Sequence, residues 1–478
     1  MSDDALWRCT AEELRGLYER REAAPVEVAR SVLERIEAVD GELHAFLHLD
    51  EAITLAAAEE AERTWLSGET PPVLCGIPVS IKDTIDTGDM PTTYGSFAFR
   101  EHRPERDAPC VELLRASGAV PLGKTNTPEF ALRGDTWNRL GPETRNPWDL
   151  ARTSGGSSGG ASAAVAAGMG PLALGTDGAG SIRGPAAYTG LVGLKPTFGR
   201  VPRGGWRGSP LRSHTGPIAR TVADTALLLQ ASAGYDTRDA HSWESDTDVG
   251  APLDIGALRG ARVAFASTEL QPGLDEEVAA AVDGTALLLR DAGCDLVVDA
   301  PPHREPVPGV ESVGPQQYSP AQYAAVHAIS PTFFDEHRSE FTSYGLASLE
   351  AGREMPGWLY QLVRDRDERY RVQVREWFRD YNYFLCAVWG TAPLIPENRE
   401  APVQPGGAGG QRGPSWTAGF NVTGNPAAAV PYGLSDGGLP IGVQIVGRFG
   451  DDLGVLRVAL VIEQGRPAGA LLSPLLGG

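Results

Sequence analysis

Two glycine-rich segments near the middle of the chain hold serines in settings where a hydroxyl group could do chemistry. The first reads Gly-Gly-Ser-Ser-Gly-Gly over residues 155–160, and the second, residues 175–183, follows an apolar run and ends in Ser-Ile-Arg. Glycine lets a backbone approach another group closely, and successive small residues in a turn leave N–H groups free to face an anion. We weigh four interpretations of the first segment: a flexible linker, a phosphate cradle, a nucleophile turn and a helix entrance.

The neighbouring sequence argues against several of these interpretations. Residues 159–160 run straight into an alanine-rich helix former at 161–167, which a flexible linker would not do. The pattern G-x-S-x-G of a nucleophile elbow also occurs, but that site needs a later histidine, and none follows His337. Residues 118–125 match the phosphate-loop pattern G-x-x-x-x-G-K-T, yet a helix is predicted before them and their interior is strand-like. We interpret that match as chance.

Helices and strands alternate along the chain around these segments. Three helical patterns come first, including a capping box at Thr10 and Glu13 and a capping aspartate at residue 50. The remaining pattern predicts strands at 73–75, 77–81, 119–122, 172–174, 262–266, 296–298 and 440–446, and helices at 108–117, 161–167, 221–233, 276–292 and 356–381. Residues 302–320 and 404–414, rich in Pro and Gly, are predicted to be irregular. The alternation predicts an α/β protein.

Composition narrows the class of partner. The net charge is −20, from 42 basic and 62 acidic side chains, and an acidic surface repels nucleic acid and anionic membranes. We find no apolar run of about 18 residues that could span a bilayer and no signal peptide at the acidic N-terminus. The five scattered cysteines fit neither a disulfide framework nor a metal clip, and no His-Glu-x-x-His site occurs. We therefore expect a cytoplasmic protein with no metal.

Taken together, three blocks resemble the amidase signature family: G-I-P-V-x-x-K-D at 76–83, the loop at 155–160, and G-T-D-x-G-G-S-I-R-x-P-A at 175–186. Further similar blocks extend from residue 123 to residue 447, and the likeness is weakest over about 300–400. The resemblance implies one large domain over residues 1–478, with a central twisted mixed β-sheet covered by helices on both faces. Within it, residues 1–70 would pack as a helical segment, 76–235 would form the signature core, and about 300–400 would line the substrate pocket.

The resemblance also implies the roles of individual residues. Ser181 would attack an amide carbonyl, Ser157 would relay its proton, and Lys82 would accept that proton, which requires a neutral, buried lysine. The peptide bond before Ser157 would be cis. The implied oxyanion hole consists of the backbone N–H groups of Gly178, Ala179, Gly180 and Ser181. The residues implied to support the loops are Ser158, Thr176, Asp177 and Arg183. Part of the substrate pocket would be formed by Leu132, Arg133 and Gly134. No metal or cofactor is implied.

The chain departs from the family pattern at two places. Ala179 replaces the first glycine of the usual Gly-Gly-Ser, which adds a methyl group beside the implied oxyanion hole. Trp389 stands where many members have a proline-rich strand end, and we expect it to shape an unusual acyl or amine pocket.

The favoured hypothesis is an amidase that hydrolyses a small carboxamide to a carboxylic acid and ammonia or an amine. An acyl transferase or amide synthase would use the same triad with an amine acceptor.

The amidase subunit of a tRNA-dependent amidotransferase, which needs partner subunits, usually carries Gln after Ser-Ile-Arg and a Ser-Leu-Asp-Gln-Ile-Gly-Pro run. Here Gly184 and the run Ser-His-Thr-Gly-Pro at 213–217 stand instead. A non-catalytic binding protein ranks last, because all triad positions are present. Family members are often dimers, so a homodimer is a further expectation.

Overall fold

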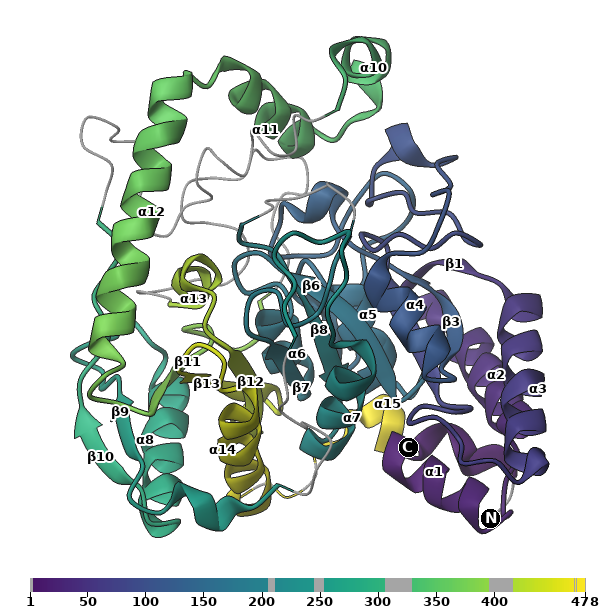
Figure 1. The fold of residues 1–478 in the computed structure, drawn as a ribbon, viewed down its shortest axis with the longest axis horizontal. Helices are drawn as coiled ribbons and strands as arrows, with labels where there is room; N and C mark the ends of the chain where they lie inside the picture. The colour runs from purple at the N-terminus through teal and green to yellow at the C-terminus, as the bar shows by residue number, and fades with distance from the viewer. Residues whose placement is uncertain are drawn as a thin grey trace.

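One large mixed sheet organises the molecule (Figure 1). The structure, a computed structural model, describes residues 3–204, 211–244, 253–305, 329–394, 416–467, 469 and 471–477. In these residues the sheet has 11 strands in the order β1-β3-β2-β6-β8-β7-β12-β13-β11-β9-β10. The strands are β1 (Phe46–Leu49), β2 (Pro78–Lys82), β3 (Val120–Thr125), β6 (Leu172–Asp177), β7 (Val192–Lys195), β8 (His214–Ala219), β9 (Arg262–Phe265), β10 (Asp295–Val298), β11 (Tyr383–Ala387), β12 (Ala427–Leu434) and β13 (Pro440–Gly447). A separate pair joins β4 (Arg145–Asn146) to β5 (Asp149–Thr153).

Parallel pairs lie on both sides of an antiparallel middle, and the edge pair of β1 with β3 is antiparallel as well. Strand β2 runs parallel to both β3 and β6, and β9 runs parallel to both β10 and β11, whereas the pairs from β6 to β11 across the centre are antiparallel. The parallel neighbours β2 and β6 therefore end at the same edge, which brings residue 82 and the turn after residue 177 together.

Helices lie on both faces of the sheet. They are α1 (Ala11–Glu19), α2 (Pro25–Leu43), α3 (Glu51–Ser67), α4 (Pro109–Ala116), α5 (Gly159–Ala166), α6 (Arg183–Thr189), α7 (Val222–Ser232), α8 (Glu276–Asp291), α10 (Pro331–His337), α11 (Ser343–Glu354), α12 (Gly357–Trp377), α13 (Thr417–Thr423), α14 (Asp452–Gly465) and α15 (Pro474–Gly477). Short 3-10 turns cover Asp3–Arg8, Phe97–Phe99, Glu129–Ala131, Ile255–Leu258 and Arg338–Glu340. The predicted α/β class and mixed sheet are confirmed.

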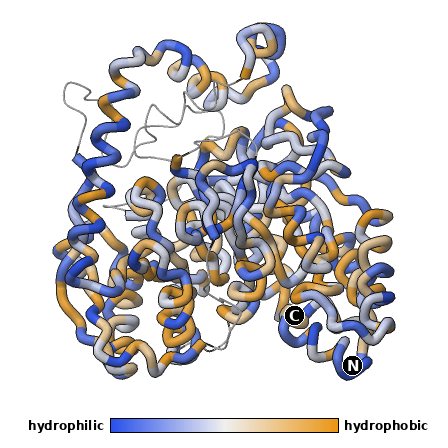
Figure 2. The backbone as a smooth tube through the Cα atoms, viewed as in Figure 1, coloured by the Kyte–Doolittle hydropathy of each residue, from blue (hydrophilic) through white to orange (hydrophobic). Residues whose placement is uncertain are grey.

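The alternation of side chains along the strands explains the two covered faces. In β11, Leu385 contributes to the core cluster that contains α7, α8 and α14, while Phe384 and Cys386 contribute to the cluster with α12 and α13. In β6, Leu172 faces the first cluster and Ala173 faces the one with α6. Successive strand residues point to opposite faces, so both faces are apolar. Figure 2 shows the hydrophobic colouring along α14 and the mixed colouring along the outer helix α12.

The capping residues and apolar patterns in the sequence mostly predicted the helices and strands that the structure shows. Thr10 caps α1 in a capping box with Glu13, Asp50 caps α3, and α3 ends at Gly68 with a left-handed φ of 83°. The strand predicted at 73–75 is wrong: these residues form a turn, because their N–H and C=O groups bond locally and to residues 117–118 rather than to a neighbouring strand. The predicted loop 404–414 and residues 306–320 lie outside the described residues.

The start of helix α11 is bound to the core by a buried carboxylate, among other contacts. Glu129 accepts hydrogen bonds from the Ser96 hydroxyl (2.6 Å), from the backbone N–H of Thr342 (2.8 Å) and from the Thr342 hydroxyl. Its own backbone N–H donates to the Tyr344 hydroxyl (2.7 Å), and aromatic side chains of both parts pack around these bonds. This docking fixes part of the predicted pocket region against the core. In the described ranges, no helix is long and apolar enough to cross a membrane.

Candidate active site

Lys82 lies at the end of β2 with its side chain wholly buried. Its Nζ is 2.7 Å from Oγ of Ser157, 2.9 Å from Oγ of Ser158 and 3.4 Å from the carbonyl oxygen of Thr176. Burial lowers the pKa of Lys82 well below its usual value, although the negative charge of Asp177 opposes that shift. The hydrogen-bond partners of Nζ are uncharged, so no ion pair within hydrogen-bond distance offsets the cost of burial. Both the burial and the contacts set this lysine apart from an ordinary charged surface lysine.

The loop that carries Ser157 and Ser158 needs its glycines for close approach. A Cβ on Gly156 would lie 2.5 Å from the carbonyl oxygen of Asp135, and one on Gly159 would lie 2.3 Å from Oγ1 of Thr136. The Gly156–Ser157 peptide bond is cis, as expected. Helix α5 begins at Gly159, so the loop is also a helix entrance.

Ser158 ties this loop to the second glycine-rich turn. Its hydroxyl donates to the carbonyl of Thr176 (3.1 Å) and accepts from the Thr176 N–H (3.3 Å), while its backbone N–H donates to the carbonyl of Ser181 (3.1 Å). The two segments singled out in the sequence thus meet beside Lys82. Ser181 is 7% exposed, and its hydroxyl makes no hydrogen bond with any described residue.

The turn between β6 and α6 is shaped by Asp177. The carboxylate accepts from the backbone N–H groups of Gly180 (2.6 Å) and Ile182 (3.1 Å), and Gly180 has a φ of 120°, a conformation that favours glycine. The N–H of Gly180 therefore points to Asp177 in this structure, and its role in the oxyanion hole stays a prediction. The N–H groups of Gly178, Ala179 and Ser181 have no hydrogen-bond acceptor among the described residues.

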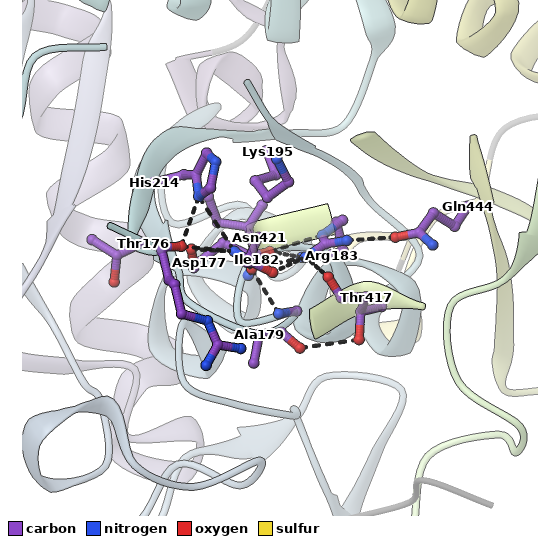
Figure 3. A network of polar contacts seen from close by, with 12 residues as sticks. Thr176, Asp177, Ala179, Ile182, Arg183, Lys195, His214, Thr417, Asn421 and Gln444 are labelled. Carbon is purple, nitrogen blue, oxygen red and sulfur yellow. Dashed lines mark hydrogen bonds and ion pairs between the residues drawn. The ribbon is translucent and has the colours of Figure 1, made fainter. Parts of the chain in front are cut away.

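A buried ion pair braces the turn from behind (Figure 3). Arg183 donates to both carboxylate oxygens of Asp177 (3.0 Å each), to Oε1 of Gln444 (2.6 Å), to Oδ1 of Asn421 (2.6 Å) and to the carbonyl of Thr417 (2.9 Å). Figure 3 shows Arg183 between Asp177 and Gln444. Burial alone would raise the pKa of Asp177, but the charge and hydrogen bonds of Arg183 outweigh burial and hold that pKa far below its usual range. Arg183 and Asp177 are both fully buried.

Three of these bracing residues were missed in the sequence. Gln444 lies in β13, where it is the only amide in a buried apolar strand, and that isolated polar residue is a usable signal. Thr417 donates from its hydroxyl to the Ala179 carbonyl (3.0 Å), and Asn421 donates to both the carbonyl and the carboxylate of Asp177. No local pattern in α13 marks Thr417 or Asn421 in advance.

A lysine and a histidine lie on the far side of the same network. Nδ1 of His214 is 2.9 Å from the carbonyl oxygen of Arg212 and 3.3 Å from Nδ2 of Asn421, and Lys195 donates to the carbonyls of Pro196 and Asn425. Burial lowers the pKa of both Lys195 and His214 well below their usual values. Both groups interact electrostatically with the Asp177 carboxylate, whose negative charge opposes the lowering of each pKa.

The residues expected to line the substrate pocket fall in two places. Leu132 is buried in the aromatic cluster that holds α11, and Arg133 pairs in two hydrogen bonds with Asp135 (2.7 and 2.8 Å). The carbonyl oxygen of Arg133 lies near Gly156, so the backbone of 133–135 contacts the serine loop, whereas the Arg133 guanidinium is bound to a carboxylate. Trp389 follows β11, is 6% exposed and packs edge-to-face on Tyr188 of α6, with ring centroids 4.3 Å apart.

Comparison with known proteins agrees with this geometry. The family model described as Amidase matches residues 27–456. A curated relative, the A subunit of the glutamyl-tRNA(Gln) amidotransferase of Acidothermus cellulolyticus, is 37% identical, with 97% of this chain and 95% of the relative covered, and further curated relatives carry the same name.

Solved structures are similar over nearly the whole chain. A bacterial aryl acylamidase of the amidase signature family has a TM-score of 0.88 at 26% identity, covering 98% of each chain. The native peptide amidase from Stenotrophomonas maltophilia has a TM-score of 0.84 at 28% identity, again covering 98% of each chain. The chain belongs to the amidase signature family, and it is an amidase that acts on amide C–N bonds.

Proposed function

We propose that this chain is a stand-alone amidase that hydrolyses a carboxamide through an acyl-enzyme on Ser181. The observation that carries the proposal is the contact of Lys82 Nζ with the Ser157 hydroxyl at 2.7 Å, beside the turn that presents Ser181. A buried amine with a lowered pKa is the type of base that can activate a serine at neutral pH.

The proposed steps need no group beyond the three side chains and water. Oγ of Ser181 attacks the amide carbon, and its proton passes to Ser157 as the Ser157 proton passes to Lys82. When the C–N bond breaks, the protons return along the same path and the nitrogen leaves as ammonia or an amine. A water molecule then uses the same relay to attack the ester, which releases the carboxylic acid and restores Ser181.

The N–H groups of Gly178, Ala179 and Ser181 are the proposed donors to the oxyanion. They belong to a turn that Asp177, Arg183 and residues of α13 hold rigid, so the donors need no reorganisation as charge develops on the carbonyl oxygen. Loss of one such donor in other hydrolases costs about 3 kcal/mol of transition-state stabilisation.

The second candidate function is that of the amidase component of a glutamyl-tRNA(Gln) amidotransferase, which the curated relatives favour by their names. One contact argues for the stand-alone role. Amidotransferase components of this kind usually carry Gln at the position of Gly184, but a Cβ on Gly184 would lie 2.2 Å from Cζ2 of Trp389. The indole occupies the space in which a glutamine side chain at position 184 would begin, which supports a pocket that differs from the usual amidotransferase pattern at this position.

The test is the activity of the purified chain alone on primary amides, anilides and amino-acid amides, with mass spectrometry of Ser181. Hydrolysis with a transient adduct on Ser181 is expected. Inactivity of the chain alone, together with release of ammonia from glutamine once the other amidotransferase components are added, would instead establish the second candidate. Adding hydroxylamine checks for acyl transfer, because a transferase forms hydroxamate in preference to the acid.

A further inference from the structure

Gly184 and Trp389 form a complementary pair next to the nucleophile. A Cβ built on Gly184 would lie 2.2 Å from Cζ2 and 2.7 Å from Cε2 and Cη2 of Trp389. Atoms cannot approach so closely, so the ring fills the volume in which any side chain at position 184 would begin. Only glycine admits Trp389 in this position.

That volume lies over the turn that carries Ser181. The N–H of Gly184 donates to the carbonyl of Gly180 at 2.7 Å, which places Ser181 inside a single helical turn. A Cα–Cβ bond in a helix tilts toward the N-terminus, so a side chain covers the turn that precedes its own Cα. The indole edge of Trp389 therefore covers the turn from 180 to 184.

Trp389 approaches this turn from the side opposite to the proton relay. Lys82 ends β2, the neighbour of β6 on one side, whereas Trp389 follows β11, which lies beyond β8, β7, β12 and β13 on the other side. In the tetrahedral intermediate the leaving nitrogen must face Ser157 to receive its proton. An acyl substituent on the side away from Ser157 lies on the side from which Trp389 approaches.

The indole N–H of Trp389 gives an independent indication that this edge of the ring borders the substrate. Nε1 of Trp389 is buried and has no hydrogen-bond acceptor among the described residues. A buried tryptophan N–H usually finds a partner, and the described residues supply none to this edge of the ring.

We propose that Trp389 is a specificity-determining residue that closes the acyl side of the pocket and restricts the enzyme to small acyl groups. The inference rests on the proposed function and adds the substrate class: amides of short carboxylic acids, with the amine part less constrained. Trp389 acts by excluding larger acyl groups from the volume beside Ser181.

The test varies the acyl group while the leaving amine stays constant. The p-nitroanilides of acetic, butyric and phenylacetic acid are the probes, and kcat/KM is measured for the wild type, Trp389→Ala and Trp389→Leu. The ratio of kcat/KM for the phenylacetyl substrate to kcat/KM for the acetyl substrate is expected to rise about 10- to 100-fold in the variants. This is the range of discrimination that a few methylene groups in a pocket produce. Trp389→Leu keeps much of the apolar volume if Trp389→Ala does not fold.

Two further variants separate pocket shape from general damage. Trp358→Ala, at a tryptophan 63% exposed on α12, is the matched control and should leave the ratio unchanged. Gly184→Ala should lose most of its activity, and Gly184→Ala with Trp389→Leu should recover activity because the smaller side chain makes room for the added methyl group.

The outcomes distinguish the two proposals. An enzyme that acylates Ser181 with an unchanged acyl ratio in both Trp389 variants would overturn the specificity role and leave the proposed function intact. A second series, with a constant acetyl group and varied anilines, would overturn the acyl-side placement if only that series responded. Absence of any adduct on Ser181 in the wild type would contradict both the proposed function and the specificity role of Trp389.

Discussion

The side-chain nitrogen of Lys82 lies 2.7 Å from the hydroxyl oxygen of Ser157, at the end of a strand that water does not reach. The same nitrogen lies 2.9 Å from the hydroxyl of Ser158, so one amine contacts two adjacent serines. Their other bonds differ. Ser158 also bonds to both backbone groups of Thr176, whereas the Ser157 hydroxyl bonds only to Lys82 among the residues that the structure describes.

Replacing each of these serines by alanine should separate relay from support. Ser157→Ala is expected to lower kcat about 10²- to 10⁴-fold, the usual contribution of a positioned proton-transfer group. Ser158→Ala should lower it less, roughly tenfold or about 1.4 kcal/mol of transition-state stabilisation, because the Lys82–Ser157 contact stays intact while the loop loses its bonds to Thr176. Steady-state kinetics on one amide, with circular dichroism to verify folding, measures both. Equal losses in the two variants would contradict the assignment of separate roles.

The pH dependence of kcat/KM should report the pKa of Lys82. Burial lowers that pKa, and the base is active only when neutral, so the rate should rise with pH through the lowered pKa and then level off. The plateau should be reached well below pH 10.5, the ordinary value for lysine. Measurement from pH 5 to 10 on a non-ionising amide is the check. A rate still rising in proportion to hydroxide at pH 10 would show that Lys82 is not the base.

The sequence predicted the residues of the site better than their contacts. Glycine spacing and the family resemblance identified the segments of Ser157 and Ser181, and the structure brings both to Lys82 because β2 and β6 are parallel neighbours. The bond from Gly180 to Asp177 could not be predicted, because which N–H groups of a turn face inward depends on dihedral angles that a run of small residues leaves open.

The remaining contacts come from parts of the chain that are far apart in sequence. Gln444 reaches Arg183 across 261 residues, and Trp389 reaches Gly184 across about 200, so no local periodicity encodes either contact. The predicted strand at 73–75 failed for a related reason. An apolar run predicts burial, but the hydrogen bonds of the folded chain decide between strand and turn.

Arg183 should contribute to both stability and catalysis. Arg183→Met leaves the buried carboxylate of Asp177 without its cation, and breaking such a pair costs about 3–5 kcal/mol of unfolding free energy. Activity should fall as well, because Asp177 holds the N–H of Gly180. Urea unfolding and kcat are the measurements. Arg20→Met, which removes an exposed ion pair with Glu22, is the matched control and should change neither. An Arg183→Met protein as stable as this control would refute the bracing role.

Glu129 should make the stability of the protein depend on pH. Burial raises its pKa from 4.5 to about 7, against the opposing hydrogen bonds from Ser96 and Thr342. The folded protein therefore holds a proton that the unfolded chain releases between these values. Stability from this group is fully present below pH 4.5 and is lost as pH rises through 7. A rise of the pKa from 4.5 to about 7 corresponds to about 3 kcal/mol.

Glu129→Gln tests this dependence, because the amide keeps the size of the side chain and does not titrate. The unfolding free energy of the wild type minus that of Glu129→Gln, measured in urea at pH 5 and pH 8, should fall by up to about 3 kcal/mol, and groups that titrate identically in both proteins cancel. Thr342→Val removes one hydroxyl donor but keeps the carboxyl group, so its pH dependence should resemble that of the wild type. A difference that stays constant from pH 5 to pH 8 would mean that Glu129 is ionised throughout, and α11 would then be docked by a carboxylate whose three donors outweigh the cost of its burial.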